Sequence, residues 1–199
     1  MNKTRKDIVK RRVLIIGVGG IGSFLVPLIK KVGSYDITIA DPDKVESKNI
    51  SYQNFSVADV GNTKVSALKH LANKTVAFPI LTENQIRNYD LVVCCADNLD
   101  VRRLIYRQGF QDNAKLKWLD LRAQGRNGAL ISYLTDPKYS DTFLSGPDGS
   151  FSCQGEDFNG TRLTKRLHFT HVAIAGMGAQ WMQRWFNEEK VQDKVIINL

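Results

Sequence analysis

The sequence predicts an α/β fold: a doubly wound, Rossmann-like, mostly parallel sheet with helices on both faces. Short apolar runs that suit buried strands alternate along the chain with longer runs of helical periodicity. The first apolar run, Val13–Ile16, has no polar alternation, which is typical of a strand buried on both faces. Glycines follow at once, and the apolar positions from Phe24 to Val32 then have the spacing of a helix. Strand, glycine turn and helix in this order are typical of a nucleotide-binding unit.

The glycine turn is Gly17-Val-Gly-Gly-Ile-Gly22. We expect Gly17 to permit the tight turn, Gly19 to let a phosphate approach the backbone, and Gly22 to let the helix pack closely on the strand. The N-terminus of that helix offers free N–H groups and the positive end of its dipole to an anion. A turn that only packs a helix on a sheet is the alternative, but the agreement of both flanks favours a bound nucleotide.

A second buried strand, Ile37–Ala40, ends in Asp41-Pro-Asp43. An acidic residue about twenty positions after the glycines, at the C-terminal end of a strand, is where the ribose of a nucleotide is held. Asp41 is therefore the predicted ribose ligand. An Asp before Pro42 also favours a turn, which is compatible with that role.

The alternation of strands and helices continues to the end of the chain. We predict helices that open at 60–64 and run to 74, from 98 to 110 and from 167 to 186, with one or two helical turns over 83–88. Strands are predicted over 76–81, 90–96, 117–123, 129–134 and 195–199, although Pro79 favours an edge position or an early end for the first of these. The segment 135–166, rich in Gly, Ser, Asp and Pro, is too long for a simple connection. All 199 residues are expected to form one domain.

The composition limits the classes of partner. A net charge of +8 suggests an acidic partner or surface, but no aromatic platform interleaves with the basic residues, so nucleic acid is an unlikely partner. No apolar run approaches membrane-spanning length, so we expect no membrane partner. Three cysteines, two of them adjacent, form neither a disulfide framework nor a Cys-x-x-Cys zinc pair. We therefore expect no structural zinc and a reducing, cytoplasmic location.

Several motifs follow the glycine turn in a fixed order. They are Asp41-Pro-Asp-Lys-Val-Glu-Ser-Lys-Asn49 with Gln53, then Val60-Gly-Asn-Thr-Lys64, then Cys95-Ala-Asp97-Asn98 with Arg102. With these motifs the chain resembles the ThiF/MoeB family, whose members also form the adenylation domains of ubiquitin-activating enzymes. The resemblance extends from Val13 to Phe186. One glycine motif is weak support for a family, whereas four ordered motifs are strong.

The resemblance implies ATP and Mg²⁺ as cofactors. It implies as substrate the C-terminal carboxylate of a ubiquitin-like or sulfur-carrier protein that ends in Gly-Gly. That carboxylate would attack the α-phosphorus and give an acyl-adenylate and pyrophosphate. A carboxylate is already ionised at neutral pH, so the site has to position the reactants and neutralise charge rather than supply a general base.

The resemblance also assigns roles to residues. Lys64 would contact phosphate and Asp97 would hold magnesium as catalytic residues, and Asn49 and Gln53 would line the phosphate region. The predicted nucleotide-binding set is Gly17, Gly19, Gly20, Gly22, Asp41, Asp43, Asn49, Gln53, Lys64 and Asn98. Taken alone, Lys64 is better explained as an exposed lysine at a helix start and Asp97 as a helix cap. The joint pattern favours the site.

Two features depart from the family pattern or extend it. Tyr52 stands where the family usually has an arginine, and the family's upstream arginine has only loose counterparts in Arg5, Arg11 and Arg12. Cys153 lies in the segment 135–166, which matches the crossover loop where relatives carry the cysteine that takes over the acyl group. Its basic neighbours favour a lowered pKa, whereas Cys94 and Cys95 should be buried and inert. These neighbours are Arg162, Lys165, Arg166 and His168. A free loop thiol is the alternative for Cys153.

Three functions remain open at this point. The chain is an activating enzyme, a degenerate relative that binds nucleotide or partner without turnover, or an NAD-dependent oxidoreductase. The last is disfavoured because Lys64, Asp97 and Asn98 would have no role. The two-fold symmetry of relatives implies a homodimer. The apolar helix 171–186, with Trp181, Met182 and Trp185, is expected to offer exposed hydrophobic surface for it, unless these side chains pack in the core.

Overall fold

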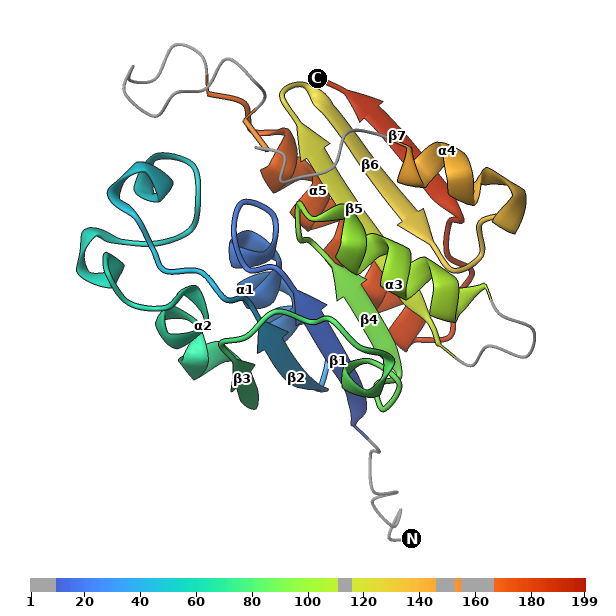
Figure 1. Cartoon of the computed structure of the whole chain (residues 1–199), viewed down its shortest axis with the longest axis horizontal. Helices are drawn as coiled ribbons and strands as arrows, with labels where there is room; N and C mark the ends of the chain where they lie inside the picture. The colour runs from blue at the N-terminus through green and yellow to red at the C-terminus, as the bar shows by residue number, and fades with distance from the viewer. Residues whose placement is uncertain (1–9, 111–115, 146–152, 155–166) are drawn as a thin grey trace, which may run out of the picture.

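The computed structural model describes residues 10–110, 116–145, 153–154 and 167–199, and the structural statements below concern these residues. Their strands form one seven-stranded sheet in the order β3-β2-β1-β4-β5-β6-β7 (Figure 1). The strands are β1 (Arg11–Ile16), β2 (Tyr35–Ala40), β3 (Lys74–Val76), β4 (Leu91–Cys94), β5 (Trp118–Gln124), β6 (Asn127–Ser132) and β7 (Lys194–Asn198). The helices are α1 (Gly22–Val32), α2 (Lys64–Ala67), α3 (Leu99–Gly109), α4 (Ser140–Leu144) and α5 (Thr170–Phe186).

The pairing of the strands confirms the predicted doubly wound, mostly parallel sheet. β1 pairs in parallel with β2 on one side and with β4 on the other, and β3 and β5 extend the parallel part outward. β6 pairs antiparallel with both β5 and β7. The chain therefore leaves β1 toward β3 and returns to β4 on the opposite side of β1. Such a reversal of strand order opens a ligand crevice at the C-terminal ends of the strands.

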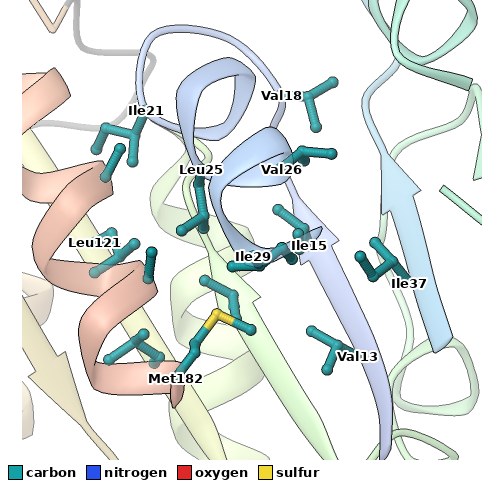
Figure 2. Close-up of a cluster of buried hydrophobic side chains, with 14 of the residues drawn as sticks. Val13, Ile15, Val18, Ile21, Leu25, Val26, Ile29, Ile37, Leu121 and Met182 are labelled. Carbon is teal, nitrogen blue, oxygen red and sulfur yellow. The ribbon is translucent and has the colours of Figure 1, made fainter. Parts of the chain in front are cut away.

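Helices α1 and α5 cover one face of the sheet. Their apolar side chains pack on alternate residues of β1, such as Val13 and Ile15, in the cluster shown in Figure 2. Leu25 and Ile29 of α1 are fully buried there, as is Met182 of α5. The unbroken apolar run of β1 is explained by this packing, because the other alternate residues of the strand face the opposite layer.

The opposite face is covered by α3 and by the segments next to it. Leu14 of β1 and Val92 of β4 belong to a second cluster, together with Ile105 of α3. The Tyr106 ring of α3 stacks on Trp118 of β5 with ring centroids 4.4 Å apart. Helix α3 begins after Asn98, whose side-chain oxygen accepts hydrogen bonds from two N–H groups of the first turn, as expected for an N-cap.

The segment between β2 and β3 differs from the prediction. The helix expected to run to 74 is a single turn, α2, followed by the 3-10 turn η3 (Lys69–Leu71). Asn73 ends this segment because both its backbone and its side chain bind the backbone of Ile37 on β2. Pairing with β2 then overrides helix propensity, and β3 occupies 74–76 instead of 76–81. Three further 3-10 turns, η1 (Ser47–Ser51), η2 (Val57–Asp59) and η4 (Glu83–Gln85), lie in the connections that flank β3.

The C-terminal helix corrects a second expectation. Trp181, Met182 and Trp185 are all buried within the chain itself, so α5 is a core helix and does not offer the exposed hydrophobic surface expected for a dimer contact. The homodimer stays a prediction without that support. Within the described residues no helix has the length and apolar character needed to cross a membrane.

The segment 135–166 is described only in part. Its first residues form η5 (Pro137–Tyr139) and α4, which lies against α3, and Cys153 and Gln154 are also described. The basic neighbours predicted for Cys153 at 162, 165 and 166, and Arg5 near the N-terminus, lie outside the described residues.

Candidate functional site

A cleft of about 1010 Å³ runs along the C-terminal ends of the parallel strands. The glycine turn and the residues after β2 line one part of it, and Asp97 and Asn98 after β4 line the middle. The lining continues onto β5 and β6. Every residue of the predicted nucleotide-binding set except Gly22 lines this cleft. The fold thus brings together the motifs that the sequence presents up to 80 positions apart.

Two glycines of the turn are required by close packing. Gly17 has φ +86°, its N–H donates to the Ala40 carbonyl at 2.8 Å, and a Cβ there would lie 2.6 Å from the Ala96 nitrogen. A Cβ on Gly22 would collide with the Gly17 carbonyl. These positions allow β1, the turn and α1 to approach one another, as predicted for them.

Gly19 is different, because a Cβ there would meet nothing closer than 3.7 Å. The nearest atoms would be the Lys64 ammonium nitrogen and the Gln53 amide nitrogen. A Cβ at Gly19 would thus be in ordinary van der Waals contact with these two donors, so packing alone does not require a glycine here. Gly20 next to it packs on Cys153, whose sulfur would lie 2.5 Å from an added Cβ.

Asp41, Asp43 and Lys64 form a compact charged group beside the turn. The Asp41 carboxylate accepts from the Val18 N–H at 2.8 Å and from the Asp43 N–H at 2.9 Å, which fixes it against the glycine turn. The Lys64 ammonium donates to Asp43 at 2.7 Å and lies 3.9 Å from Asp41. Lys64 is only 8% exposed, so it is not the exposed helix-start lysine of the alternative interpretation.

The pKa values of this group follow from burial and from the mutual charges. Burial raises the pKa of Asp41, although Lys64 and the two backbone donors act in the opposite direction. For Lys64, burial alone would lower the pKa, but Asp41, Asp43 and the nearby Asp97 outweigh it and raise the pKa. Lys64 is therefore a fixed positive charge at neutral pH.

Asn49, Tyr52 and Gln53 come from the 3-10 turn η1 and the residues after it. The Asn49 side chain accepts from the Glu46 N–H and donates to the Tyr52 hydroxyl at 3.2 Å. Gln53 is 8% exposed, and its side-chain oxygen has no hydrogen-bond partner within the described structure. Tyr52 thus supports Asn49 with a neutral hydroxyl and brings no positive charge to the cleft.

Asp97 and Asn98 follow β4 at the middle of the cleft. Asp97 is exposed there and acts electrostatically on both Lys64 and Cys153. The Asn98 oxygen is taken by the N-terminal turn of α3, at 2.8 Å from the Asp100 nitrogen, so only its amide NH₂ faces a ligand. Both residues are therefore brought into the predicted site, with Asn98 serving as a helix cap as well.

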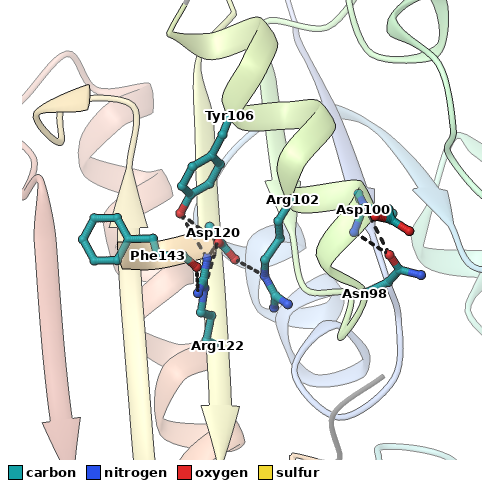
Figure 3. Close-up of polar contacts among 8 residues, drawn as sticks. Asn98, Asp100, Arg102, Tyr106, Asp120, Arg122 and Phe143 are labelled. Carbon is teal, nitrogen blue, oxygen red and sulfur yellow. Dashed lines mark hydrogen bonds and ion pairs between the residues drawn. The ribbon is translucent and has the colours of Figure 1, made fainter. Parts of the chain in front are cut away.

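A buried arginine cluster borders the cleft on the β5 side, and sequence reasoning missed most of it. It consists of Arg102, Tyr106, Asp120 and Arg122 (Figure 3). Asp120 is fully buried and accepts from both arginines and from the tyrosine hydroxyl. Burial alone would raise the pKa of Asp120, but the two guanidinium groups lower it. The signal that could have revealed it is an Asp between two leucines in a predicted buried strand, because a buried carboxylate requires a cationic partner.

Cys153 lies between the glycine turn and α5. Its pKa is raised to about 11 by burial, contrary to the lowered pKa expected from basic neighbours. Gln154 donates to the His171 ring at 3.4 Å, and the other ring nitrogen of His171 lies 2.7 Å from the Tyr52 carbonyl. Burial also raises the pKa values of Cys94 and Cys95. Cys94 is buried as expected, whereas Cys95 is partly exposed and lines the cleft.

The residues fit a bound magnesium nucleotide. The Lys64 ammonium and the Gln53 side chain lie near Gly19, and the buried Gln53 side-chain oxygen has no partner within the described structure. Asp41 and Asp43 contact the single ammonium of Lys64, and Asp97 is near enough to act on it electrostatically, so negative charge exceeds positive charge around Lys64. The described residues contain no cluster of three or more metal-binding side chains. A magnesium ion would therefore rely on phosphate oxygens together with one or two carboxylates.

Comparisons with known proteins agree with the motifs. The model of the ThiF family matches residues 2–185. The ATP-dependent ubiquitin transferase-like protein Cap2 of Enterobacter hormaechei subsp. hoffmannii is 30% identical over 102 residues, which are 45% of this chain and 17% of that protein. The ubiquitin-like modifier-activating enzyme 5 of Gallus gallus is 31% identical over 126 residues, 50% of this chain and 32% of that protein.

Solved structures share the fold. Escherichia coli MccB superposes with a TM-score of 0.70 at 17% identity, covering 95% of this chain and 59% of the other. PaaA superposes with a TM-score of 0.67 at 18% identity, covering 95% of this chain and 61% of the other. The chain thus spans about three fifths of these structures and between 17% and 32% of the two relatives above.

Proposed function

Because this chain belongs to the ThiF family, we propose that it adenylates the C-terminal carboxylate of a ubiquitin-like or sulfur-carrier protein that ends in Gly-Gly, with ATP and Mg²⁺. One observation supports this above all others. The Lys64 ammonium and the Gln53 amide lie beside Gly19 in the cleft, where we expect a phosphate to approach the turn. Bound ATP would supply an electrophilic α-phosphorus and a pyrophosphate leaving group.

The residues of the chain would act by position and charge. Asp41, fixed by two backbone donors, presents its remaining lone pairs to ribose hydroxyls. Lys64 would neutralise phosphate oxygens from a buried position, where a charge acts more strongly than in water. Asp97 would hold the magnesium ion at the mouth of the cleft, and Asn49, Gln53 and Asn98 would donate amide N–H groups. No residue has to accept a proton, because the substrate carboxylate is ionised.

ATP–pyrophosphate exchange in the presence of the partner protein tests the reaction. Exchange that requires both the partner and its free C-terminal carboxylate would support the proposal. Thermal stabilisation by ATP–Mg²⁺ without exchange would instead favour the degenerate relative that only binds nucleotide. Equal stabilisation by NAD and ATP–Mg²⁺ would contradict the proposal and favour an oxidoreductase.

The substrate needs its own test, because the names of related proteins differ. Solved structures of Escherichia coli MccB include one with N-formylated MccA, whereas other relatives are named as ubiquitin-like modifier-activating enzymes. Exchange with a folded protein that ends in Gly-Gly, but not with its isolated C-terminal peptide, would support a protein substrate. We also propose a cytoplasmic homodimer, which light scattering at micromolar concentration would test.

Cys153 is our proposed acceptor for a second step, in which its sulfur attacks the acyl-adenylate and releases AMP. It lines the cleft beside Gly20, close enough to Asp97 and Lys64 to be affected by their charges. Its thiol is protonated at neutral pH in this structure, so the step requires loss of the thiol proton to solvent or base. Cys153→Ala should leave pyrophosphate exchange unchanged and abolish a thiol-sensitive adduct with the partner. An adduct that persists in Cys153→Ala but disappears in Cys95→Ala would contradict this choice.

A further inference from the structure

Arg102 is the least satisfied member of the buried arginine cluster. Its side chain is only 7% exposed, and its Nε donates to Asp120 at 3.0 Å. Among the described residues, this bond from Nε is the hydrogen bond that the Arg102 side chain makes, and its two terminal nitrogens, Nη1 and Nη2, make none. Arg102 also lines the cleft. Four N–H donors on a buried cation are thus directed to a place where a ligand can reach them.

Arg122, in the same cluster, has a hydrogen-bond partner for each of its side-chain nitrogens. Its Nε and Nη2 donate to Asp120, Nη2 also lies 3.2 Å from the Tyr106 hydroxyl, and Nη1 donates to the Phe143 carbonyl at 2.6 Å. Arg122 and Tyr106 both donate to Oδ2 of Asp120, and the charge of Arg122 is enough to neutralise the carboxylate, whereas Oδ1 accepts from Arg102 within the described residues. The charge of Arg102 is therefore the surplus of the cluster, which carries two guanidinium groups and one carboxylate.

The order of the strands separates this surplus charge from the phosphate-binding residues. Asp41 follows β2 and the glycine turn follows β1, whereas Asp120 is on β5. With neighbouring strands about 4.8 Å apart, β5 lies about 10 Å from β1 and about 14 Å from β2. A nucleotide with its ribose at Asp41 and its phosphates at the glycine turn leaves the β4–β5 side of the cleft to the second reactant.

We propose that the Nη1 and Nη2 end of Arg102 binds the ionised carboxylate of the acyl substrate in the cleft, while Asp120 holds the guanidinium in position. This inference rests on the proposed function, in which the second reactant is a carboxylate. A guanidinium edge with two coplanar donors matches the two oxygens of a carboxylate. Pairing with Arg102 reduces the repulsion between the substrate and the triphosphate, a task for which Tyr52 brings no charge. No bond to Arg102 is formed or broken.

Two small probes test the assignment: acetyl-glycylglycine, which carries a carboxylate, and its C-terminal amide, which does not. Each is titrated into wild-type protein and into Arg102→Gln, Arg102→Lys and Arg103→Gln, with and without a non-hydrolysable ATP analogue and Mg²⁺. Arg103 is the matched control, because it is next to Arg102 on α3 but pairs with the exposed Asp100. Binding of the ATP analogue and the melting temperature are measured for each variant.

We expect wild-type protein and Arg103→Gln to prefer the carboxylate probe by about tenfold or more, the equivalent of one charge-assisted contact. Arg102→Gln should lose this preference and keep its affinity for the ATP analogue, and Arg102→Lys should keep part of the preference. If Arg102→Gln does not fold, side-chain resonances of isotope-labelled arginine in the wild type decide. The carboxylate probe must shift the Arg102 resonance, and the amide must not.

Three results would overturn the inference. The first is an unchanged preference in folded Arg102→Gln, which would leave Arg102 as a partner of Asp120 only. The second is a loss of nucleotide affinity with the carboxylate preference retained, which would assign Arg102 to a phosphate. The third is a wild type that does not distinguish the probes. A wild type that fails to bind ATP–Mg²⁺ but prefers the carboxylate through Arg102 would contradict the proposed function and support the carboxylate site.

Discussion

The two sides of the cleft are built on opposite principles. On the β1–β2 side, backbone groups make the site: a glycine turn, an Asp41 carboxylate held by two N–H donors, and one lysine beside an excess of carboxylates. On the β5 side, side chains make it: a fully buried carboxylate surrounded by two arginines and a tyrosine hydroxyl. The first side carries surplus negative charge and the second surplus positive charge.

On our proposals, this difference would let one cleft accept two anionic reactants. A nucleotide on the negative side would bring a divalent cation with it, whereas a carboxylate on the positive side would find its counter-charge in the protein. The charged residues on the two sides should also have different roles. Charges on the β1–β2 side should matter mainly for binding and reaction, and Asp120 on the β5 side mainly for the stability of the fold.

Loss of Asp120 should have the largest effect on stability. Asp120→Asn leaves two guanidinium groups close together in the protein interior, and we expect the free energy of unfolding to fall by about 3–5 kcal/mol. Urea denaturation measures this. The exposed Asp100, which also pairs with an arginine, is the control, and Asp100→Asn should cost less than about 1 kcal/mol. Equal effects of the two variants would contradict the distinction between the sides.

The pH dependence of the folding stability gives a second test of the role of Asp120. The pKa of its carboxylate is lowered in the folded protein by Arg102 and Arg122 despite burial. As the pH falls, the Asp120 carboxylate is protonated in the unfolded chain before it is protonated in the folded protein. The ion pairs of Asp120 therefore stabilise the fold fully above the ordinary Asp pKa, and this stabilisation is lost as the pH falls to the lower pKa of the folded state. Asp120→Asn should therefore show a flatter decline of stability in acid than the wild type.

Loss of Asp97 should instead lower the activity strongly and leave the stability almost unchanged. Asp97→Ala removes the predicted magnesium ligand from an exposed strand end, so pyrophosphate exchange should fall about 100- to 1,000-fold. The midpoint of urea denaturation should stay within the range of ordinary surface substitutions, about 0.5 kcal/mol. Asp100→Ala, in the first turn of the adjacent helix, is the control and should exchange normally. Full activity of Asp97→Ala would contradict the assignment of Asp97 to the site.

Two glycines of one turn distinguish packing from binding. Gly17→Ala places a Cβ 2.6 Å from the Ala96 nitrogen at φ +86°, and should destabilise the fold by about 1–3 kcal/mol. Gly19→Ala meets no atom closer than 3.7 Å, so stability should change little while ATP–Mg²⁺ binding weakens. Denaturation and nucleotide titration of the pair measure both quantities. Normal nucleotide affinity in Gly19→Ala would contradict the phosphate approach at this position.

His171 should give the smallest effect. Burial lowers its pKa, although the carbonyls of Tyr52 and His168 act in the opposite direction, so the ring stays neutral in the folded protein. An unfolded histidine takes up a proton as the pH falls below about 6.5. This contribution to stability is therefore present above that pH and is lost as the pH falls toward the lower folded value. His171→Gln should flatten this decline and cost about 1 kcal/mol at neutral pH. The exposed His70→Gln should change neither.

Local patterns in the sequence were enough to predict several parts of this protein. The apolar run of β1, the glycines after it and the strand before Asp41 predicted the parallel sheet and the position of the cleft, because a strand buried on both faces cannot alternate polar and apolar residues. The capping of α3 by Asn98 was also predictable, since the side chain binds N–H groups of its own segment.

Other features depend on contacts between segments that are distant in the sequence. Pairing of Asn73 with β2 set the start of β3, the sheet under α5 buried Trp181 and Trp185, and packing against Gly20 accompanies the raised pKa of Cys153. Arg122 lies two residues from Asp120 on β5, whereas Arg102 reaches Asp120 only because α3 packs beside β5. Sequence spacing records neither the burial of a charge nor its partners across the fold, and these determine whether that charge serves stability or a ligand.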